Sequence, residues 1–239
     1  MEKQKFNQII KEYAKEISIE LDDKKVEQFY MYMELLLEWN EKINLTAITK
    51  PEEVILKHFI DSLTIINKIK PNTKIVDVGT GAGFPGIPIK IVKEDVEIVL
   101  VDSLNKRIHF LDEVIQKLGL TKIETIHSRA EELGRNKKIR ETFDYATSRA
   151  VANLSTLSEY LMPFVKVGGN VIAMKGSEIE EELQKAQKAI SILGGEVIAV
   201  EKFILPKSDI KRHIITIKKR NMTPMKYPRK AGTPAKEPI

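Results

Sequence analysis

Several residue types are absent or rare in this chain of 239 residues, which has no cysteine, one tryptophan and four histidines. Without cysteine, disulfide bonds and thiolate metal sites are excluded, and the scattered histidines give no metal-ligand spacing. No apolar run approaches the roughly 20 residues that a membrane-spanning helix needs, and no secretory leader is recognisable. We therefore expect a cytoplasmic protein that binds neither a metal ion nor a membrane.

The basic residues concentrate toward the C-terminus, although the net charge is only +5. The segment from Pro206 to Ile239 has ten Lys and Arg residues against two acids, whereas the rest of the chain has 29 basic and 32 acidic residues. A near-neutral body with a basic tail is typical of a protein that binds a polyanion. The same distribution also fits a solvated tail that only keeps the protein soluble.

The first 70 residues have the apolar spacing of helices. Apolar side chains recur at helical intervals from Phe6 to Ile17 and again from Val26 to Leu37. Pro51, followed by two glutamates, marks the start of a third helix that should continue to about Ile69. The pattern predicts an N-terminal helical extension over residues 1–70.

The pattern changes at residue 71, where short β-branched runs alternate with helical ones. Strands are expected at 74–78, 97–102, 122–127, 143–148, 170–174, 196–204 and 213–217, with helices at 87–92, 108–118, 154–161 and 178–193. Alternating strands and helices predict parallel βαβ units, and the last two strands are close enough to form a hairpin. Val167-Gly168-Gly169 is expected to be a turn into the fifth strand. The predicted fold is α/β, with a mostly parallel seven-stranded sheet and a C-terminal antiparallel strand over residues 71–220, followed by a basic tail over 221–239.

A glycine-rich loop follows the first predicted strand, between Asp77 and Gly86, and opens a helix. It fits two motifs. Gly81, Gly83 and Gly86 match G-x-G-x-x-G, which binds dinucleotides. Gly79, Gly81 and Gly83, with Asp77 ahead of them, match D-x-G-x-G-x-G, which is typical of S-adenosylmethionine binding. The loop by itself does not choose between the two ligands.

Three further features favour S-adenosylmethionine. Fingerprint glycines usually begin directly after the strand, which selects the motif that starts at Gly79, and the C-terminal hairpin suits a methyltransferase sheet better than an all-parallel dinucleotide fold. Asp77 would repel a pyrophosphate but is compatible with a sulfonium and an ammonium group. Asp102, at the end of the second strand, would bind ribose hydroxyls with either ligand. The sequence thus predicts a Rossmann-like class I methyltransferase.

Segments along nearly the whole chain, in order, also match those of one known family. They are Asn44–Thr46, His58–Leu63, Asp77–Pro88, Asp102–Ser103 with Lys106–Arg107, Ser128–Glu132, Ser148–Ala152, Lys175–Gly176, and Thr223–Pro224 with Tyr227–Gly232. In this combination the chain resembles the RsmG family, formerly called glucose-inhibited division protein B.

This resemblance implies a bacterial enzyme that methylates N7 of one guanosine in 16S ribosomal RNA. It also implies that Asp102 holds the ribose, that Ala130 and Glu131 lie beside the adenine, and that Arg149 closes the pocket. The partner would be 16S rRNA or the small ribosomal subunit, and we expect a monomer. The residues expected to bind the cofactor are Gly79, Thr80, Gly81, Gly83, Phe84, Asp102, Ser103, Ala130, Glu131 and Arg149.

The composition also restricts the atom that can accept a methyl group. Methylation of a pyrimidine carbon requires a nucleophile, usually cysteine, which this chain lacks. Methylation of an exocyclic amine often uses a proline-rich loop after the fourth strand, where this chain has Ser148 to Val151 without proline. Guanine N7 has a free lone pair, so positioning can replace a general base. Our hypothesis is that Arg149 or Lys175 contacts O6 or a phosphate as the catalytic cation, while a carboxylate reads the N1–H and N2 edge.

Two other groups of residues leave their roles open. His58 and Asp61 lie three apart on one predicted helix and can meet, either as a packing pair or as a contact to substrate. Basic residues near the C-terminus are expected to hold phosphates: Lys218, Lys219, Arg220, Lys226, Arg229 and Lys230. The rival interpretations are a nucleotide-dependent oxidoreductase and a ribosome-binding factor without turnover.

Overall fold

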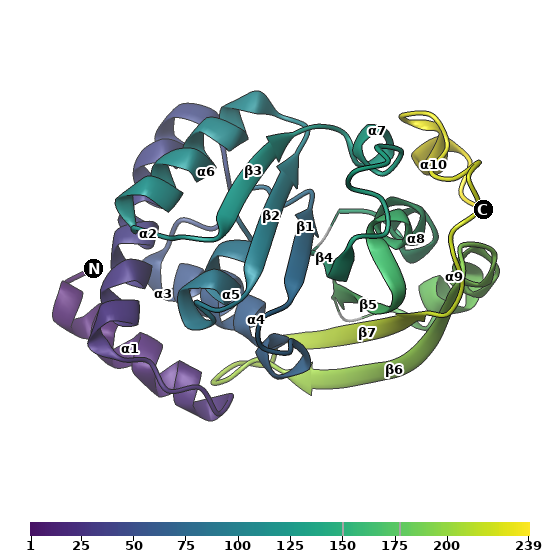
Figure 1. The fold of residues 1–239 in the computed structure, drawn as a ribbon. Coiled ribbons are helices and arrows are strands. Elements are labelled where there is room, and N and C mark those ends of the chain that lie inside the picture. The colour runs from purple at the N-terminus through teal and green to yellow at the C-terminus, as the bar shows by residue number, and fades with distance from the viewer. Residues whose placement is uncertain (150, 177) are drawn as a thin grey trace.

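We describe a computed structural model covering residues 1–149, 151–176 and 178–239. Ala150, which belongs to one of the segments used above, and Ser177 lie outside the described residues. Figure 1 shows a central sheet with helices on both faces. The strands are β1 (Lys74–Val78), β2 (Glu97–Asp102), β3 (Ile123–His127), β4 (Phe143–Arg149), β5 (Val165–Lys175), β6 (Gly195–Ile204) and β7 (Lys211–Lys219).

The described residues form one seven-stranded sheet in the order β3-β2-β1-β4-β5-β7-β6. The first five strands pair in parallel, whereas β7 is antiparallel to both β5 and β6. This confirms the predicted mixed sheet. The chain reverses its winding direction between β1 and β4, so the carboxyl ends of these two strands border a crevice.

Alternate side chains of the strands enter two separate hydrophobic cores. In β2, Ile98 and Leu100 belong to one core while Val99 and Val101 belong to the other. This follows from the two-residue period of a strand, which points successive side chains to opposite faces. Strands buried on both faces are typical of parallel sheets, and they explain why the strands are short continuous apolar runs in the sequence.

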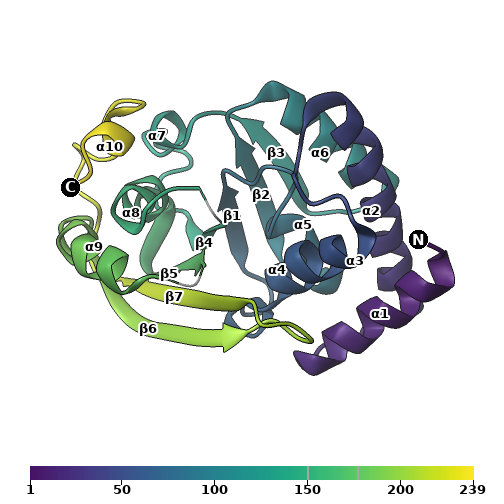
Figure 2. The ribbon, with the colours of Figure 1, turned by 180° about the vertical axis from the view of Figure 1, so that it is seen from behind.

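The N-terminal helices and the first two crossover helices cover one face of the sheet (Figure 2). These are α1 (Lys3–Glu16), α2 (Asp23–Ile43), α5 (Gly86–Val92) and α6 (Asn105–Lys117). Helix α2 begins after Asp22, whose side chain accepts a hydrogen bond from the Lys25 amide at 2.8 Å and so acts as the N-cap. Tyr32 of α2 donates a hydrogen bond to the Ala82 carbonyl, so the helical layer supports the glycine loop directly.

The third predicted helix is not uniform. It consists of α3 (Pro51–Val54), a π-helix (Ile55–Ile60), α4 (Asp61–Leu63) and a 3₁₀ turn (Ile66–Lys68). We call residues 51–63 the π segment. Wide π turns inside helices occur frequently at functional sites, because they change the direction of the side chains. Here the π-helix carries His58 and leads directly into Asp61.

The opposite face carries α7 (Ala130–Leu133), α8 (Leu154–Leu161), a 3₁₀ turn (Met162–Phe164), α9 (Glu180–Ile192) and α10 (Thr233–Lys236). The prediction of a turn at Val167–Gly169 is wrong, because these residues lie inside β5. The register between β4 and β5 shifts at this point, from Phe143 opposite Val165 to Tyr145 opposite Asn170. The glycines therefore form an irregularity within a longer strand.

The residues after β7 pack against the domain. Tyr227 is only 8% exposed and belongs to the second core. Lys219, the last residue of β7, is also buried, with 1% of its surface exposed. It forms an ion pair with Glu141 at 2.9 Å and donates a hydrogen bond to the Met162 carbonyl at 2.6 Å. The expectation that Lys219 holds a phosphate is therefore wrong, because its ammonium group is buried among internal acceptors.

Candidate functional site

Two cavities open at the carboxyl ends of the strands and meet between β1 and β4. Their volumes are about 430 and 470 Å³. Gly79, the first residue after β1, and Arg149, the last residue of β4, line both of them. We call the first the guanidinium cavity, because Arg149 and Arg212 line it, and the second the carboxylate cavity, because Asp102 and Glu131 line it. Ligands of open α/β sheets bind at such a reversal of strand order.

The loop between β1 and α5 depends on glycines with left-handed backbone. Gly79, Gly81 and Gly83 have φ angles of +68°, +63° and +95°, a region that residues with a side chain rarely adopt. The amide groups of Gly79 and Thr80 donate to the Val101 carbonyl on β2, at 2.8 and 3.1 Å. The loop is thereby fixed across the end of β2, where it lines the guanidinium cavity.

Two of the loop glycines allow close packing. A Cβ atom on Gly83 would lie 2.6 Å from the Tyr32 hydroxyl, and one on Gly86 would lie 2.3 Å from a methyl group of Leu100. Both distances are shorter than a carbon side chain tolerates. Gly83 therefore packs against helix α2, and Gly86 brings α5 close to the sheet.

Asp77 connects two parts of the glycine loop by hydrogen bonds. It is fully buried, and its Oδ2 accepts hydrogen bonds from the Thr80 hydroxyl at 2.7 Å and from the Gly86 amide at 2.9 Å. Within the described part of the chain, its Oδ1 has no hydrogen-bond partner. Burial raises the pKa of this carboxyl group to about 6. The carboxyl group thus joins both ends of the loop and keeps acceptor capacity on one oxygen.

Asp102 connects the loop to the carboxylate cavity. It ends β2 and is 2% exposed. Its Oδ2 accepts from the Gly81 amide at 2.9 Å and from the Arg107 guanidinium at 3.2 Å, and its Oδ1 accepts from the Leu104 amide at 2.9 Å. A carboxylate offers about four acceptor positions. Three internal partners therefore leave capacity for a ligand hydroxyl.

The rest of the carboxylate cavity comes from the loop after β3, from α8 and from the C-terminal residues. Glu131, on α7, is 5% exposed, and its Oε1 accepts a hydrogen bond from the Gly232 amide at 2.8 Å. Further lining residues are Ser103, Ser128, Ala130, Tyr160, Gly232 and Ala235. Six of the residues predicted to bind the cofactor line this cavity: Asp102, Ser103, Ala130 and Glu131, together with Gly79 and Arg149, which it shares with the guanidinium cavity.

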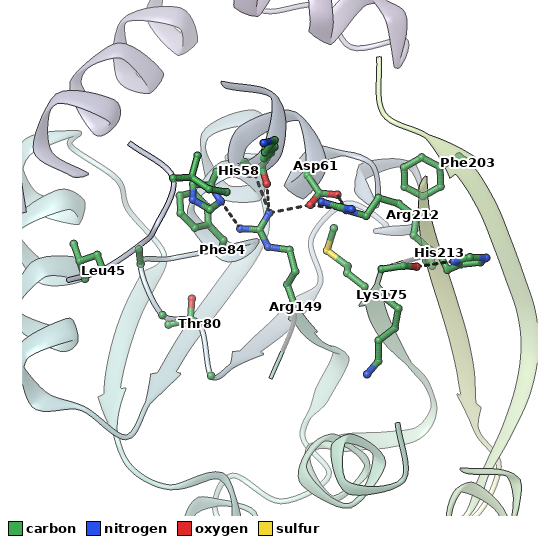
Figure 3. A pocket seen from close by; sticks show the side chains of 18 residues that line it. Leu45, His58, Asp61, Thr80, Phe84, Arg149, Lys175, Phe203, Arg212 and His213 are labelled. Atoms are coloured by element: carbon green, nitrogen blue, oxygen red, sulfur yellow. Dashed lines mark hydrogen bonds and ion pairs between the residues drawn. The ribbon is translucent and has the colours of Figure 1, made fainter. Parts of the chain in front are cut away.

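Arg149 is held by acceptors of the π segment, as Figure 3 shows. Its Nη1 donates to the Lys57 carbonyl at 3.0 Å and to Asp61 Oδ2 at 3.2 Å, and its Nη2 donates to His58 Nδ1 at 3.0 Å. The guanidinium carbon lies 5.0 Å from the centre of the Phe84 ring, a distance at which a cation is attracted to an aromatic face. Arg149 therefore joins β4, the π segment and the glycine loop.

Asp61 is shared by two guanidinium groups. Its side chain is 3% exposed, and it accepts hydrogen bonds from Arg149 and from Arg212 Nε, both with a shortest distance of 3.2 Å. Arg212 belongs to β7, so this carboxylate links the π segment to the C-terminal hairpin (Figure 3). A buried carboxylate between two cations compensates charges that would otherwise repel each other.

His58 is a neutral part of the same network. Its ring stacks on Phe84 with the centroids 4.4 Å apart, and its Nε2 lies 2.8 Å from Thr46 Oγ1. Because Arg149 donates to Nδ1, we assign the ring proton to Nε2. Burial and the nearby Arg149 charge lower the pKa of His58 to about 3. The predicted meeting of His58 with Asp61 takes place through Arg149, which binds both.

Lys175 lines the guanidinium cavity, but its ammonium group is directed elsewhere. Nζ donates to the Ala152 carbonyl and to Glu182 Oε1, both at 2.5 Å. Figure 3 shows the side chain pointing away from Arg149 and Asp61. The two predicted catalytic cations are therefore near each other in the fold, yet both are bound to internal acceptors.

Some residues of the site were not expected from the sequence. Arg212 and His213 line the guanidinium cavity, as does Lys57, whereas the sequence interpretation counted Arg212 only among the charges of the basic C-terminal region. The strand pattern placed Arg212 directly before the last predicted strand, whereas the structure has it inside β7, and nothing in the pattern indicated which elements lie beside it. Among the described residues, no group of three or more His, Asp or Glu side chains converges as a metal ion would require, and no helix is long and apolar enough to cross a bilayer.

Solved structures with the same architecture define the class of the fold. A SAM-dependent methyltransferase from Aquifex aeolicus superposes with a TM-score of 0.55 at 18% identity, over 73% of this chain and 96% of that one. TYW2 from M. jannaschii, solved in complex with AdoMet, gives 0.53 at 14% identity, over 66% and 74% of the two chains. The fold is that of a class I methyltransferase, with the antiparallel β7 inserted between β5 and β6.

The sequence comparisons are more specific. The family model described as "rRNA small subunit methyltransferase G" matches residues 25–215. "Ribosomal RNA small subunit methyltransferase G" of Clostridium novyi is 50% identical over 98% of this chain and 97% of its own length, and that of Alkaliphilus oremlandii is 53% identical over 97% and 98%. The chain belongs to the rRNA small subunit methyltransferase G family, which confirms the resemblance found in the sequence.

Proposed function

We propose that this protein transfers the methyl group of S-adenosylmethionine to N7 of a guanosine in 16S ribosomal RNA. The observation that carries the proposal is the pair of cavities meeting at Gly79 and Arg149, in a chain whose family match spans residues 25–215. The carboxylate cavity offers hydrogen-bond acceptors for a nucleoside. The guanidinium cavity offers a cationic wall for the base that receives the methyl group. An rRNA substrate would place the protein in the cytoplasm, and we propose that it acts there as a monomer.

The carboxylate cavity fits the adenosine part of S-adenosylmethionine. Its volume of about 470 Å³ is within the range of small-molecule pockets. Asp102, with its remaining acceptor capacity, would hold the ribose hydroxyls, and Ala130 and Glu131 would lie beside the adenine. Ser103 would line the ribose end.

The junction of the cavities fits the methionine part. Gly79, Thr80 and Gly81 would bring the backbone close to the ligand, Phe84 would border it, and Gly83 would maintain the bend of the loop through its contact with α2. Oδ1 of Asp77, which has no hydrogen-bond partner among the described residues, leaves negative potential next to the loop, which favours a sulfonium or ammonium group. When bound, S-adenosylmethionine supplies an electrophilic methyl group at this junction.

The residues of the guanidinium cavity would act by positioning. Because guanine N7 already has a lone pair, the protein needs to orient the base in line with the methyl group and to exclude water. His58 is neutral at physiological pH, since its pKa is about 3, and its ring and Phe84 form a rigid wall together with Arg149. Such a wall would fix the approach of the base without acting as a general base.

The cation that contacts O6 or a phosphate would be Arg149 or Lys175. Arg149 is anchored at 3.0–3.2 Å to three groups of the π segment, so it would offer its remaining surface without moving. Lys175 would have to exchange Glu182 for the RNA. A donor bonded to N7 itself would occupy the attacking lone pair, and both cations are held back from that position by their internal acceptors.

Exposed lysines of the C-terminal region would hold the RNA backbone. Lys226 and Lys230 are exposed, whereas Arg220 and Arg229 are paired with Glu196 and Glu159. Replacing both lysines with Gln should weaken RNA binding and reduce the slope of log affinity against log salt by about one to two, since each phosphate contact contributes about 0.7–0.9. Substituting Lys3 and Lys5 in the same way provides the control. An unchanged slope would contradict this part of the proposal.

The overall test measures methyl transfer directly. Purified protein is incubated with tritiated S-adenosylmethionine and either protein-free 16S rRNA or intact small subunits, and the nucleosides are identified by mass spectrometry. We expect 7-methylguanosine at one position, and much less of it with Asp102→Ala when S-adenosylmethionine is below saturation. Calorimetry with S-adenosylmethionine and with NADH runs in parallel. Binding of NADH alone would instead support an oxidoreductase.

A further inference from the structure

The last turn of the chain contributes to the carboxylate cavity. We call residues Pro228–Lys236 the C-terminal strap. In both views of the ribbon, α10 lies next to α7 and α8, far along the chain from both (Figures 1 and 2). Gly232 and Ala235 of the strap line the cavity together with Asp102 and Glu131. This segment follows β7 and is therefore an addition to the seven-stranded sheet.

The strap is fastened to the domain at its N-terminal end. Glu159 on α8 is fully buried, and it accepts two hydrogen bonds from the Arg229 guanidinium, at 3.0 and 2.6 Å, and one from the Arg229 amide at 2.7 Å. Arg135 Nε donates to the Pro228 carbonyl at 2.8 Å. Ion pairs with two parallel hydrogen bonds are geometrically specific, so this end of the strap has one defined position.

A second fastening lies near the other end, where the Thr156 hydroxyl donates to the Pro234 carbonyl at 2.9 Å. Pro234 is buried, whereas Ala231 and Ala235 are exposed. Between the two fastenings, the Gly232 amide donates to Glu131 Oε1 at 2.8 Å. The strap is thus tied on both sides of the residue that contacts the cavity carboxylate.

We infer that the C-terminal strap is a wall of the cofactor site. Gly232 is a positioning residue that holds Glu131, and Ala235 limits the space at the adenosine end. This inference rests on the proposed function, because it takes the carboxylate cavity as the adenosine site. It adds residues of the chain terminus, outside the glycine loop and the strand ends, to the set that determines affinity for S-adenosylmethionine.

The physical basis is preorganisation. A buried glutamate without a fixed partner would lose its hydrogen bonds and adopt several rotamers, and a ligand would then have to order it on binding. With the Gly232 amide on Oε1, the carboxylate orientation is set before the ligand arrives. The strap also covers the adenosine end, which increases the buried surface of a bound ligand.

The decisive comparison uses two exposed alanines of the same strap. Ala235→Leu adds bulk at a position that lines the cavity, and Ala231→Leu adds the same bulk four residues earlier, outside the set of lining residues. The dissociation constant of S-adenosylhomocysteine is measured by calorimetry on the full chain. We expect about tenfold weaker binding (about 1.4 kcal/mol) for Ala235→Leu and an unchanged value for Ala231→Leu. Equal constants for the two variants would overturn the inference.

Kinetic and proteolytic readouts separate this role from a general effect on folding. Ala235→Leu should raise the KM for S-adenosylmethionine and leave kcat at saturating cofactor unchanged, whereas a lower kcat with an unchanged KM would contradict a wall role. In the wild type, S-adenosylhomocysteine should slow tryptic cleavage after Lys230 relative to cleavage after Lys5. Identical cleavage with and without ligand would also contradict it. Failure of the proposed function has a different signature, namely no binding of S-adenosylhomocysteine to the wild type.

Discussion

The two cavities that meet at Gly79 and Arg149 are built in different ways. The carboxylate cavity is built mainly from strand ends and the loops that follow them, with the C-terminal strap at one side, and the side chain of Asp102 is bonded to residues no more than 21 positions away. The guanidinium cavity joins Asp61 to Arg149, 88 positions on, and to Arg212, 151 positions on. The acceptor at the centre of the first cavity is thus held by local contacts, whereas the carboxylate at the centre of the second has its guanidinium partners only when three distant elements meet.

This difference suggests different sensitivities to mutation. Asp102 faces the proposed ligand site and is held by backbone amides. Its replacement should therefore change mainly the affinity for the ligand. A buried carboxylate between two guanidinium groups also holds the fold together, because its loss leaves uncompensated charges. Substitutions in the guanidinium cavity should therefore lower activity and stability together. Substitutions in the carboxylate cavity should lower ligand affinity with little loss of stability.

The largest effect is expected for Asp61→Ala. Removing the shared carboxylate leaves Arg149 and Arg212 without their common partner, and the free energy of unfolding should fall by about 3 kcal/mol. Urea denaturation measures this. Asp23→Ala is the control, since the Asp23 side chain is 96% exposed in its ion pair with Lys11 and exposed pairs contribute little. If Asp61→Ala were as stable as Asp23→Ala, the shared carboxylate would not hold the fold together and the proposed difference between the cavities would be wrong.

Asp102→Ala should act mainly on affinity. We expect S-adenosylhomocysteine to bind about 100-fold more weakly, which corresponds to about 2.7 kcal/mol, because a ribose acceptor and the brace on Gly81 are both lost. Calorimetry and thermal unfolding are run on the same sample. The exposed Asp209→Asn serves as the reference. If Asp102→Ala lowered stability as much as Asp61→Ala, the two cavities would not differ in the way we describe.

The pH dependence of stability sharpens the comparison further. The pKa of His58 falls from 6.5 to about 3 on folding, so between these values the unfolded chain binds more protons. This contribution to stability is complete above pH 6.5 and is lost as the pH falls toward 3. The pKa of Asp77 rises from 3.8 to about 6 and acts in the opposite sense between those values.

The difference between wild type and His58→Asn isolates the histidine. Their difference in unfolding free energy should shrink as the pH is lowered from 7 to 5, by at most about 1.4 kcal/mol per pH unit. His109→Asn, at an exposed helical position, is the reference substitution measured alongside. A pH-independent difference for His58→Asn would mean that the ring is not held neutral by the network.

The smallest effect concerns Lys175. If its ammonium exchanges Glu182 for RNA, Lys175→Met should lower the methyl-transfer rate about tenfold, as expected for one charge-assisted hydrogen bond, with unchanged affinity for S-adenosylhomocysteine. Glu182→Gln, which weakens the internal competitor, should retain or raise the rate. Normal transfer by Lys175→Met would leave Arg149 as the remaining candidate cation.

Much of the fold was predictable because its signals are local. Each of the seven strands overlaps the range that the alternation of strand and helix patterns predicted. The exceptions have physical reasons. The glycines at 168 and 169 indicate a turn in the sequence, but Val165 and Asn170 on either side of them both pair with β4, so the glycines lie inside β5. Nothing in the residues from Ile55 to Ile60 distinguishes a π turn from an α-helix, because the same short apolar run is compatible with either.

The candidate site divides in the same way. The loop glycines and Asp102 were recognisable from their position after strands, and the resemblance to the family added Glu131 and Arg149. The partners of Arg149 were not predictable, since spacing suggested a direct contact between His58 and Asp61. Arg212 and the strap residue Ala235 had no local signal, because their place in the site depends on which elements lie side by side.

The sequence by itself determined the order of strands and helices, the glycine loop and the family, since each of these depends on residues close together in the chain. Only the tertiary structure decided that Asp61 bridges two arginines, that Lys219 is buried, and that the last residues line a cavity. The reason is that burial and charge compensation depend on distances in space, and a chain of this length can bring almost any two of its segments into contact.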